Sequence, residues 1–447
     1  MSSKTQVSQW GWKGLLLGLL AQAACGAVPE ALEEAAREDA QEDSVPTLNA
    51  PPSPEPTWST PTFATGTAVA TDGHQSLVVW RDVLRPSEMF AARVSKNGRL
   101  LDPESIPLNP ESAFEPGAPA VAFDGEQFIV TWHGPSTLIV ARVNRDGTLE
   151  GPPIALVETP GSGSSRSGIA CTWRKCLVAW AEYLVPQGVR GIMVEFEGTD
   201  IRSREILIAS PTPANTSFGV PVAFSNNRFL VAWSSDALSL PKVFAARVTY
   251  DGTVLDPGGF LLSDTPGAQT FLDAVGTRQG FLVAWSDSRT GTLDIFGTFV
   301  RPDGFVPNRE GFPISTGPDE DFTPALAYDG HRVLATWARQ SPGQITLLGN
   351  FVSAGGTLDP EDSFLLSDGA FARELDQDVV SLNGKFFMAH GAASIVDEPP
   401  FQVILGTRVK KDGTRVDDPA IRISHSPSVE ETLPASQPLA PKGRTQD

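Results

Sequence analysis

The chain has 447 residues, with 34 Lys and Arg against 53 Asp and Glu, a net charge of −19, three Cys and five His. The negative charge excludes a general nucleic acid binder, because such a protein needs a positive field to displace counterions from the phosphates. The few scattered Cys and His furnish neither a disulfide scaffold nor a C-x-x-C zinc pair. We therefore expect no nucleic acid partner, no cofactor and no zinc or redox centre.

Residues 1–25 have the features of a signal peptide. Lys4 and Lys13 precede or border an apolar run at residues 14–21, which is too short to span a bilayer. Two cleavage sites stay open at its end: residues 21–23 (AQA) fit an ordinary secretory signal, and residues 22–25 (QAAC) resemble a bacterial lipobox with Gln in place of the usual Leu. The lipobox is favoured, because the other two cysteines can pair and leave Cys25 alone in an oxidising compartment.

Acylation of Cys25 would place the protein in the cell envelope. The resemblance to bacterial lipoproteins then implies enough hydrocarbon for stable membrane anchoring. Gly26 follows the cysteine, where Asp would be the retention signal of that family, so an outer membrane lipoprotein is expected. Without acylation, the expectation is a secreted or periplasmic protein.

Residues 26–62 have the composition of a disordered tether. They carry eight acidic residues and one base, with few large apolar side chains. Such a segment buries too little apolar surface to offset its ordering entropy. The prolines between Pro46 and Pro61 favour extended chain that holds a domain away from a surface. Residues 426–447 are similarly rich in Pro, Ser and Glu, and we expect a disordered tail.

Between these ends, residues 63–425 contain seven copies of one unit. An apolar run closes on Trp80, and equivalent runs recur at spacings of 52, 48, 53, 52, 52 and 53 residues. A Gly-containing turn recurs in phase, and several copies are nearly identical to the one at residues 251–257 (DGTVLDP). Two markers in register over seven periods indicate a repeat architecture. The seven run-closing residues, called anchors below, are Trp80, Trp132, Trp180, Trp233, Trp285, Trp337 and His390.

Each unit divides into four short strands, for which blade four provides the example. The predicted strands are residues 221–224, 229–233, 243–248 and 260–263. Runs such as residues 229–233 are apolar at every position, so both faces of the strand must be covered. Sheets stacked radially in a β-propeller cover both faces. An open solenoid, the alternative, needs polar capping repeats, and the terminal copies here are no more polar than the others. The prediction is an all-β, seven-bladed β-propeller of four-stranded antiparallel blades.

The repeated sequence pattern resembles that of a known group of proteins. The pattern "DG…VAW…DG-x-x-LDP" is similar to the tandem repeat of secreted and lipoprotein β-propellers of bacteria, of the myxobacterial type. The resemblance covers about four fifths of the chain. It implies a propeller fold and an exterior location, and no activity.

Two side-chain patterns fit this frame. Cys171 and Cys176 precede their anchor by the same intervals as the aromatic pair Phe224 and Phe229, so we expect a disulfide across the first hairpin of blade three. A redox switch at this pair is the weaker alternative. Arginines recur in the third strand, and we expect them to stack on aromatic rings between blades; they are Arg93, Arg142, Arg247 and Arg408.

The connections after the second strands are long and variable, and binding residues in propellers are expected on such loops. Charged residues stand two positions after four anchors, and His133 follows its anchor directly. Further acids precede the next blades, including Glu320, Asp321 and Asp378. Solvated loop charges are the favoured interpretation, with a calcium site as a weaker one. The candidate ligand-binding residues are Asp82, His133, Glu182, Asp287 and Arg339.

These observations predict an exported, lipid-anchored, monomeric propeller of the cell envelope. We expect it to bind a protein or polysaccharide through its loops, without catalysis. Two alternatives remain open. One is a glycan-cleaving enzyme that pairs carboxylates such as Asp82 and Asp287 as acid and base. The other is a structural component of the cell surface or of a motility apparatus.

Overall fold

The structure is a computed structural model that describes residues 66–82, 87–109, 115–159, 166–182, 187–210, 219–236, 240–358, 363–367, 373–394 and 401–424. The predicted signal peptide, Cys25, the tether and the tail lie outside these residues. All regular elements in the described part are β-strands. Nowhere in this part does a helix occur that could cross a membrane.

Seven four-stranded antiparallel sheets, here called blades one to seven, follow one another along the chain. Blade one contains β1 (Ala68–Thr71), β2 (Gln75–Arg81), β3 (Met89–Ser95) and β4 (Ile106–Pro107), and blade two contains β5 (Ala120–Phe123), β6 (Phe128–His133), β7 (Thr137–Val143) and β8 (Ile154–Glu158). Blade three contains β9 (Gly168–Thr172), β10 (Lys175–Glu182), β11 (Gly188–Glu197) and β12 (Asp200–Ala209), and blade four contains β13 (Val222–Ser225), β14 (Arg228–Ser235), β15 (Lys242–Thr249) and β16 (Phe260–Leu261).

The remaining three blades have the same order of strands. Blade five contains β17 (Gln269–Thr277), β18 (Gly280–Asp287), β19 (Asp294–Val300) and β20 (Phe312–Ser315). Blade six contains β21 (Glu320–Tyr328), β22 (Val333–Ser341), β23 (Gln344–Val352) and β24 (Phe364–Leu365), and blade seven contains β25 (Arg373–Leu382), β26 (Lys385–Ser394), β27 (Phe401–Val409) and β28 (Ile421–Arg422).

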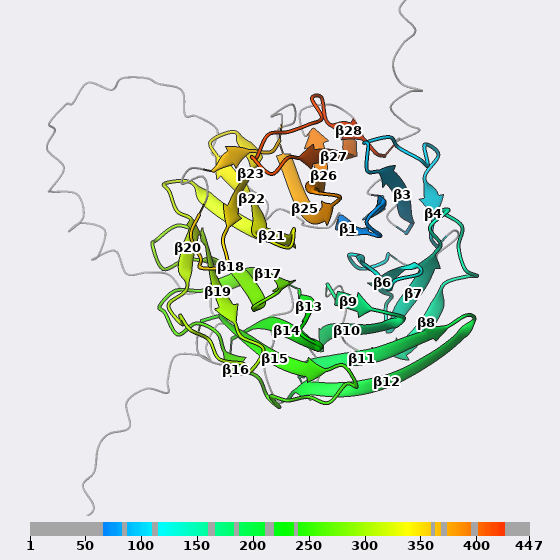
Figure 1. The fold of residues 1–447 in the computed structure, drawn as a ribbon, viewed down its shortest axis with the longest axis horizontal. Helices are drawn as coiled ribbons and strands as arrows, with labels where there is room; N and C mark the ends of the chain where they lie inside the picture. Colours follow the sequence, from blue (N-terminus) through cyan, green and yellow to red (C-terminus); the bar gives the residue numbers. More distant parts are fainter. Residues whose placement is uncertain are drawn as a thin grey trace, which may run out of the picture. The chain divides into compact units, whose positions relative to one another are not determined.

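The blades form a ring with the first strand of each innermost (Figure 1). The predicted seven-bladed propeller is therefore confirmed. Each sheet consists of four consecutive strands, so the ring is closed between blades seven and one by contacts rather than by a shared strand. One such contact runs from the backbone N–H of Val69 to the carboxylate of Asp378, at 2.8 Å.

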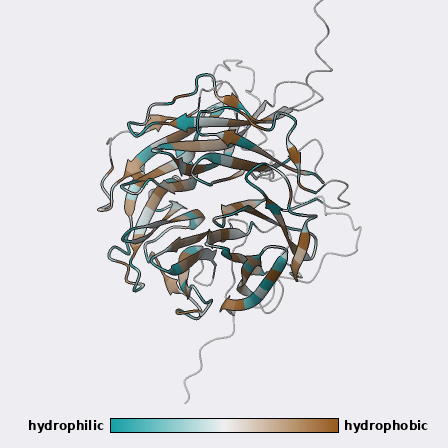
Figure 2. Ribbon diagram, turned by 45° about the vertical axis from the view of Figure 1, so that its right-hand side comes forward, coloured by the Kyte–Doolittle hydropathy of each residue, from teal (hydrophilic) through white to brown (hydrophobic). Residues whose placement is uncertain are grey.

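The core lies between neighbouring blades. Every residue of β6 and of β18 is buried, as the continuous apolar runs predict. Figure 2 shows apolar residues concentrated in the strands and polar residues in the connections. The anchors Trp180, Trp233, Trp285 and Trp337 are completely buried, and His390 takes the same place in blade seven with 1% exposure. Each blade thus buries its second strand against both neighbours.

Two faces of the ring follow from the connections. The turns between first and second strands lie beside the turns between third and fourth strands, as shown by the hydrogen bond from Lys96 N–H to His74 O at 3.1 Å. We call this side the turn face. The connections after second strands meet those before first strands on the other side, where Asp321 N–H donates to Leu293 O at 2.7 Å. We call that side the loop face.

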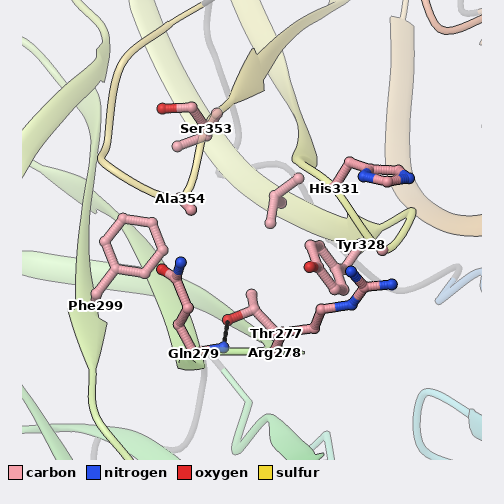
Figure 3. Close-up of a pocket in the computed structure, with 11 residues that line it drawn as sticks. Thr277, Arg278, Gln279, Phe299, Tyr328, His331, Ser353 and Ala354 are labelled. Carbon is pink, nitrogen blue, oxygen red and sulfur yellow. Dashed lines mark hydrogen bonds between the residues drawn. The ribbon is translucent and has the colours of Figure 1, made fainter.

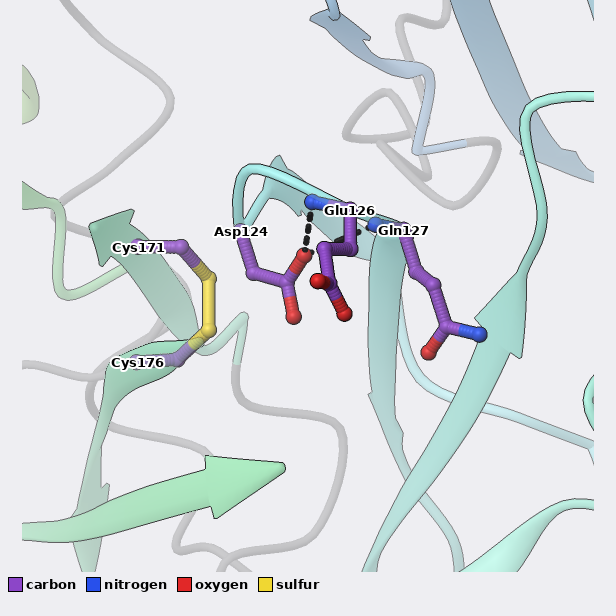
Figure 4. The surroundings of a disulfide bond; sticks show 5 residues. All are labelled: Asp124, Glu126, Gln127, Cys171 and Cys176. Carbon is purple, nitrogen blue, oxygen red and sulfur yellow. Dashed lines mark hydrogen bonds between the residues drawn. A yellow bond between two sulfur atoms is a disulfide. The ribbon is translucent and has the colours of Figure 1, made fainter. Parts of the chain in front are cut away.

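The predicted disulfide between Cys171 and Cys176 is present and joins paired residues of β9 and β10. It occupies the place of the aromatic pairs Phe123–Phe128 and Phe224–Phe229, whose ring centroids lie 5.1 Å and 4.8 Å apart. Figure 4 shows it beside the turn of blade two, where Asp124 accepts hydrogen bonds from the backbone of Glu126 and Gln127.

Removing this disulfide is expected to cost about 2 kcal/mol of stability, because the loop that it closes is short. The test is urea denaturation of a Cys171→Ala, Cys176→Ala variant. A Cys171→Phe, Cys176→Phe variant is the control, since it restores the aromatic pair of blades two and four, and it should recover part of the loss. Equal losses in both variants would contradict the equivalence of the disulfide and the aromatic pair.

Arginine side chains cross the boundaries between blades, but mostly not by the predicted stacking on aromatic rings. Arg247 forms two hydrogen bonds with the carboxylate of Asp256, each 2.8 Å long, and donates a further one to Pro302 O in blade five at 3.0 Å. The pairs Arg93–Asp102 and Arg408–Asp417 repeat this arrangement, and Arg408 thereby reaches blade one. Only Arg142 of the predicted four lies over a ring, that of Phe196 at 5.8 Å.

The physical reason is the turn that is repeated after the third strands. Its Asp lies nine residues after the arginine in blades one, four and seven, and the hairpin brings the two side chains together. A carboxylate holds a planar guanidinium at two points more strongly than a ring does. The remaining guanidinium N–H is then directed at the next blade.

Candidate functional site

The predicted site residues of the loop face are held by internal partners. Glu182, at the end of β10, pairs with Arg190 of β11 at 2.5 Å. Arg339, in β22, forms two hydrogen bonds of 2.7 Å with Asp321 of β21. Ser315 also donates to Asp321, so this carboxylate is fully enclosed by polar partners and has no exposure. These charges therefore join neighbouring strands at the loop face.

Asp287 is the centre of a second buried network. Its carboxylate accepts hydrogen bonds from the indole N–H of the anchor Trp285 at 2.8 Å and from the side chain of Gln269 at 3.2 Å. The Arg289 guanidinium pairs with it at 2.5 Å and lies over the Phe296 ring at 3.9 Å. A buried carboxylate with this many donors is compensated in place. It is not exposed to a ligand.

The other two predicted residues differ from each other. Asp82 follows β2 on the loop face, is half-buried, and its backbone N–H donates to Glu88 O at 3.2 Å. His133 ends β6 and is completely buried, with Nδ1 at 3.4 Å from the hydroxyl of Thr159. Burial lowers the pKa of His133 to about 4, so its ring is neutral at physiological pH. The structure brings none of the five predicted residues together into one cluster.

Three residues that were not among the predicted site residues gather around the ring centre. Arg166 lies two residues before β9 in blade three, and its guanidinium donates to Thr67 O in the first-strand region of blade one at 3.0 Å. Its side chain therefore reaches past the innermost strand of blade two. Asp273 of β17 and Asp378 of β25 lie close enough to Arg166 for its charge to lower the pKa of both carboxyls.

The two aspartates also join neighbouring blades. Asp273 accepts the backbone N–H of Leu326 in blade six at 2.8 Å, as Asp378 accepts that of Val69 in blade one. Both lie opposite the residue that precedes an anchor. A comparison of the seven repeats at this position would have found them, because the other blades carry only small residues there, namely Ala68, Ala120, Gly168, Pro221 and Ala325.

Their surroundings disfavour ionisation. Both side chains are half-buried and lie among the innermost strands of the ring. Burial raises the pKa of Asp273 to about 7, and repulsion from Asp378 adds to this effect. The pKa of Asp378 is also raised by burial, against the hydrogen bond from Val69 and the charge of Arg166. The pair can therefore hold a proton at neutral pH and exchange it.

The chemical capacity of the described residues follows from these contacts. No group of three or more His, Cys, Asp or Glu side chains in the described ranges is placed to hold a metal ion. The loop-face carboxylates Glu182, Asp287 and Asp321 are neutralised by arginines. The carboxyls of Asp273 and Asp378 are the described pair whose raised pKa values suit proton transfer.

No family model and no curated protein matches the chain. Similar solved structures include the β-propeller domain of the Trilobed protease from Pyrococcus furiosus, with 9% identity, a TM-score of 0.47, and coverage of 81% of this chain and 98% of that chain. Puromycin hydrolase has 13% identity and a TM-score of 0.43 over 81% of this chain, which spans only 54% of that chain. A thermostable family-43 glycoside hydrolase has 10% identity and a TM-score of 0.39, over 59% of this chain and 95% of that chain. These similarities concern the propeller fold alone.

Proposed function

We propose that this protein is an exported binding module of the bacterial cell envelope, which recognises a protein or polysaccharide through its loop face without catalysis. The observation that carries the proposal is the internal pairing of Glu182, Asp287 and Arg339. Side chains that are already paired cannot act as a free acid and base. They join neighbouring strands at the edge of the loop face, and a fixed surface loses less entropy when a partner binds.

The export and the lipid anchor of the proposal rest on residues 1–25. A signal peptide with Cys25 at its end would attach the propeller to the outer membrane through the acidic, Pro-rich segment of residues 26–62. The disulfide of blade three fits an oxidising compartment outside the cytoplasm.

A second candidate function has its own observation in its favour. Asp273 has a pKa of about 7, and Asp378 lies near it at the ring centre. A carboxylic acid that keeps its proton at neutral pH, beside a second carboxyl, is the arrangement that glycoside hydrolysis uses. In this candidate the enzyme would cleave a glycan at the loop-face opening of the ring, with Asp273 as the acid.

The binding proposal is tested with a variant that leaves the internal pairs intact. Glu115, Asp264 and Glu320 are exposed acids of the loop face, and all three are changed to Lys in one full-length chain. The matched control carries Lys at Glu104, Glu205 and Glu310, which are exposed acids away from that face. Cross-linked capture from envelope extract, and retention on immobilised polysaccharides, are measured for both chains.

We expect the loop-face variant to lose at least about tenfold in capture, because reversed charges repel a complementary partner, and the control to retain it. Equal capture by the two variants, or no capture by the unmodified chain, would overturn the binding proposal. Release of reducing sugar by the unmodified chain, abolished by Asp273→Asn, would establish the enzyme instead.

A further inference from the structure

An arginine crosses almost every boundary between neighbouring blades. In each case its guanidinium donates to a backbone carbonyl in the turn after the third strand of the next blade. In blades one, two, four and seven the arginine comes from the third strand, in blade three from β12, and in blade six from the first turn. The arginines are Arg93, Arg142, Arg204, Arg247, Arg332 and Arg408.

The boundary between blades five and six is the exception among the described residues. Phe299 of β19 pairs with Leu282 as Arg247 pairs with Leu230, so it takes the arginine's place. Asn308 stands five residues after Asp303, as Asp256 stands five after Asp251, so the carboxylate that would hold the arginine is absent too. Gly280 stands directly before the apolar run of blade five. Arg332 holds the equivalent position in blade six, so blade five has no arginine there either.

A pocket of about 200 Å³ lies at this boundary, on the turn face. Phe299 and Ala354 line it, and the carbonyl of Ala354 is the counterpart of the Pro302 carbonyl that accepts from Arg247. In Figure 3, Phe299 lies on one side of the pocket, and Arg278, Tyr328 and His331 gather on the other. The pocket thus exists because a side chain that fills this space elsewhere has been replaced.

The lining defines the chemistry of a ligand. No Asp or Glu lines the pocket, whereas Arg278 and His331 do. Arg278 is exposed, and its guanidinium lies near Gly330 without a carboxylate partner among the described residues. Phe299 and Tyr328 add aromatic faces, and Gln279 and Ser353 add hydrogen-bonding groups. A guanidinium without a carboxylate partner favours a carboxylate ligand, and aromatic side chains favour the apolar face of a sugar ring.

We propose that this pocket binds an acidic sugar, with the carboxylate of a uronic acid on Arg278 and the sugar ring against Phe299 and Tyr328. The pocket volume of about 200 Å³ lies below the size at which pockets for drug-sized molecules start, about 300 Å³, so it suits a single sugar ring. This site lies on the face opposite the proposed loop-face site and does not depend on it. A partner polysaccharide that carries uronic acids would therefore be held through its acidic residues.

The experiment titrates the full chain with sodium galacturonate, with galactose and with sodium acetate, by isothermal calorimetry. We expect galacturonate to bind with a Kd of about 1 mM, the affinity typical of a small polar ligand in a partly open site. Galactose and acetate should bind at least about tenfold more weakly, since each lacks one of the two contacts.

Two pocket variants and one control locate the site. Arg278→Ala should weaken galacturonate at least about tenfold, and Arg301→Ala, which removes another exposed arginine of the turn face, should leave it unchanged. A Phe299→Arg, Asn308→Asp variant rebuilds the pair of blade four, fills the pocket and should abolish binding. The circular dichroism and Tm of each variant establish that it is folded.

Three results would overturn the proposal: no binding of galacturonate at 50 mM or below (on the order of fifty times the expected Kd), equal binding of galactose or acetate, or unchanged binding in both pocket variants. None of these results bears on capture through the loop face, because Arg278 and Phe299 lie on the turn face.

Discussion

Replacing Arg339 by alanine is expected to lower the free energy of unfolding by about 3 to 5 kcal/mol, the usual cost of leaving a buried charge without its partner. Asp321 has no solvent exposure, and Arg339 provides both of its charged hydrogen bonds at 2.7 Å. Without the guanidinium, only the hydroxyl of Ser315 would still donate to this carboxylate. Urea denaturation at pH 7 measures the loss.

Arg202→Ala is the matched control for this prediction. Its ion pair with Glu197 lies on the surface, where the two side chains are 69% and 52% exposed. Exposed pairs contribute little, so the control should lose less than about 1 kcal/mol. If Arg339→Ala and Arg202→Ala lose the same amount, the loop-face charges are not structural. An Asp321→Asn, Arg339→Ala double variant should be more stable than Arg339→Ala alone, since it removes the unpaired charge.

A second large effect is expected in the dependence of stability on pH. Asp273 has a pKa of about 7 in the folded protein against 3.8 for the ordinary group, so folding favours its protonated form. The stabilisation is complete below about pH 4, and it is lost as pH rises to 7 and the folded carboxyl gives up its proton. A shift of this size corresponds to about 4 kcal/mol. Above pH 7 the ionised group adds no further pH dependence.

Asp273→Asn should remove this contribution. The amide is neutral at every pH, and its oxygen can still accept the N–H of Leu326. We expect the variant to match the unmodified chain near pH 4 and to exceed its stability by up to about 4 kcal/mol at pH 8. Urea denaturation from pH 4 to 8 compares the two. Asp264→Asn, at an exposed aspartate between β16 and β17, is the control. A constant difference between the curves at all pH values would contradict the raised pKa.

Both predictions change how a loop-face variant should be designed. Substituting Asp287 or Arg339 would test the integrity of blades five and six before it tested any partner. The exposed acids Glu115, Asp264 and Glu320 avoid this problem because their side chains lie at the surface. Loss of binding in that variant can then be assigned to the surface itself.

The turn face and the ring centre show which patterns were visible in the sequence. The nine-residue spacing of Arg93 to Asp102 recurs as Arg247 to Asp256 and Arg408 to Asp417, so these pairs could have been found before the structure. The same holds for Asp273 and Asp378, which interrupt a position of small residues. The crossing of Arg166 to Thr67 could not, because it joins blades one and three without any local pattern.

The sequence alone determined the blades, their strands and the disulfide of blade three. Strand periodicity, turn residues and the spacing of anchors act within about fifty residues, where the order of the chain decides which groups meet. The tertiary structure decided which charges are free. Glu182, Asp287 and Arg339 look alike as loop charges in the sequence. The neighbouring strand of the same blade gives Glu182 and Arg339 their partners, and packing buries Asp287 together with Arg289, two residues further along the chain. The pocket at Phe299 likewise exists because blade six receives no arginine side chain from the third strand of blade five. That relation depends on how the two blades pack against each other.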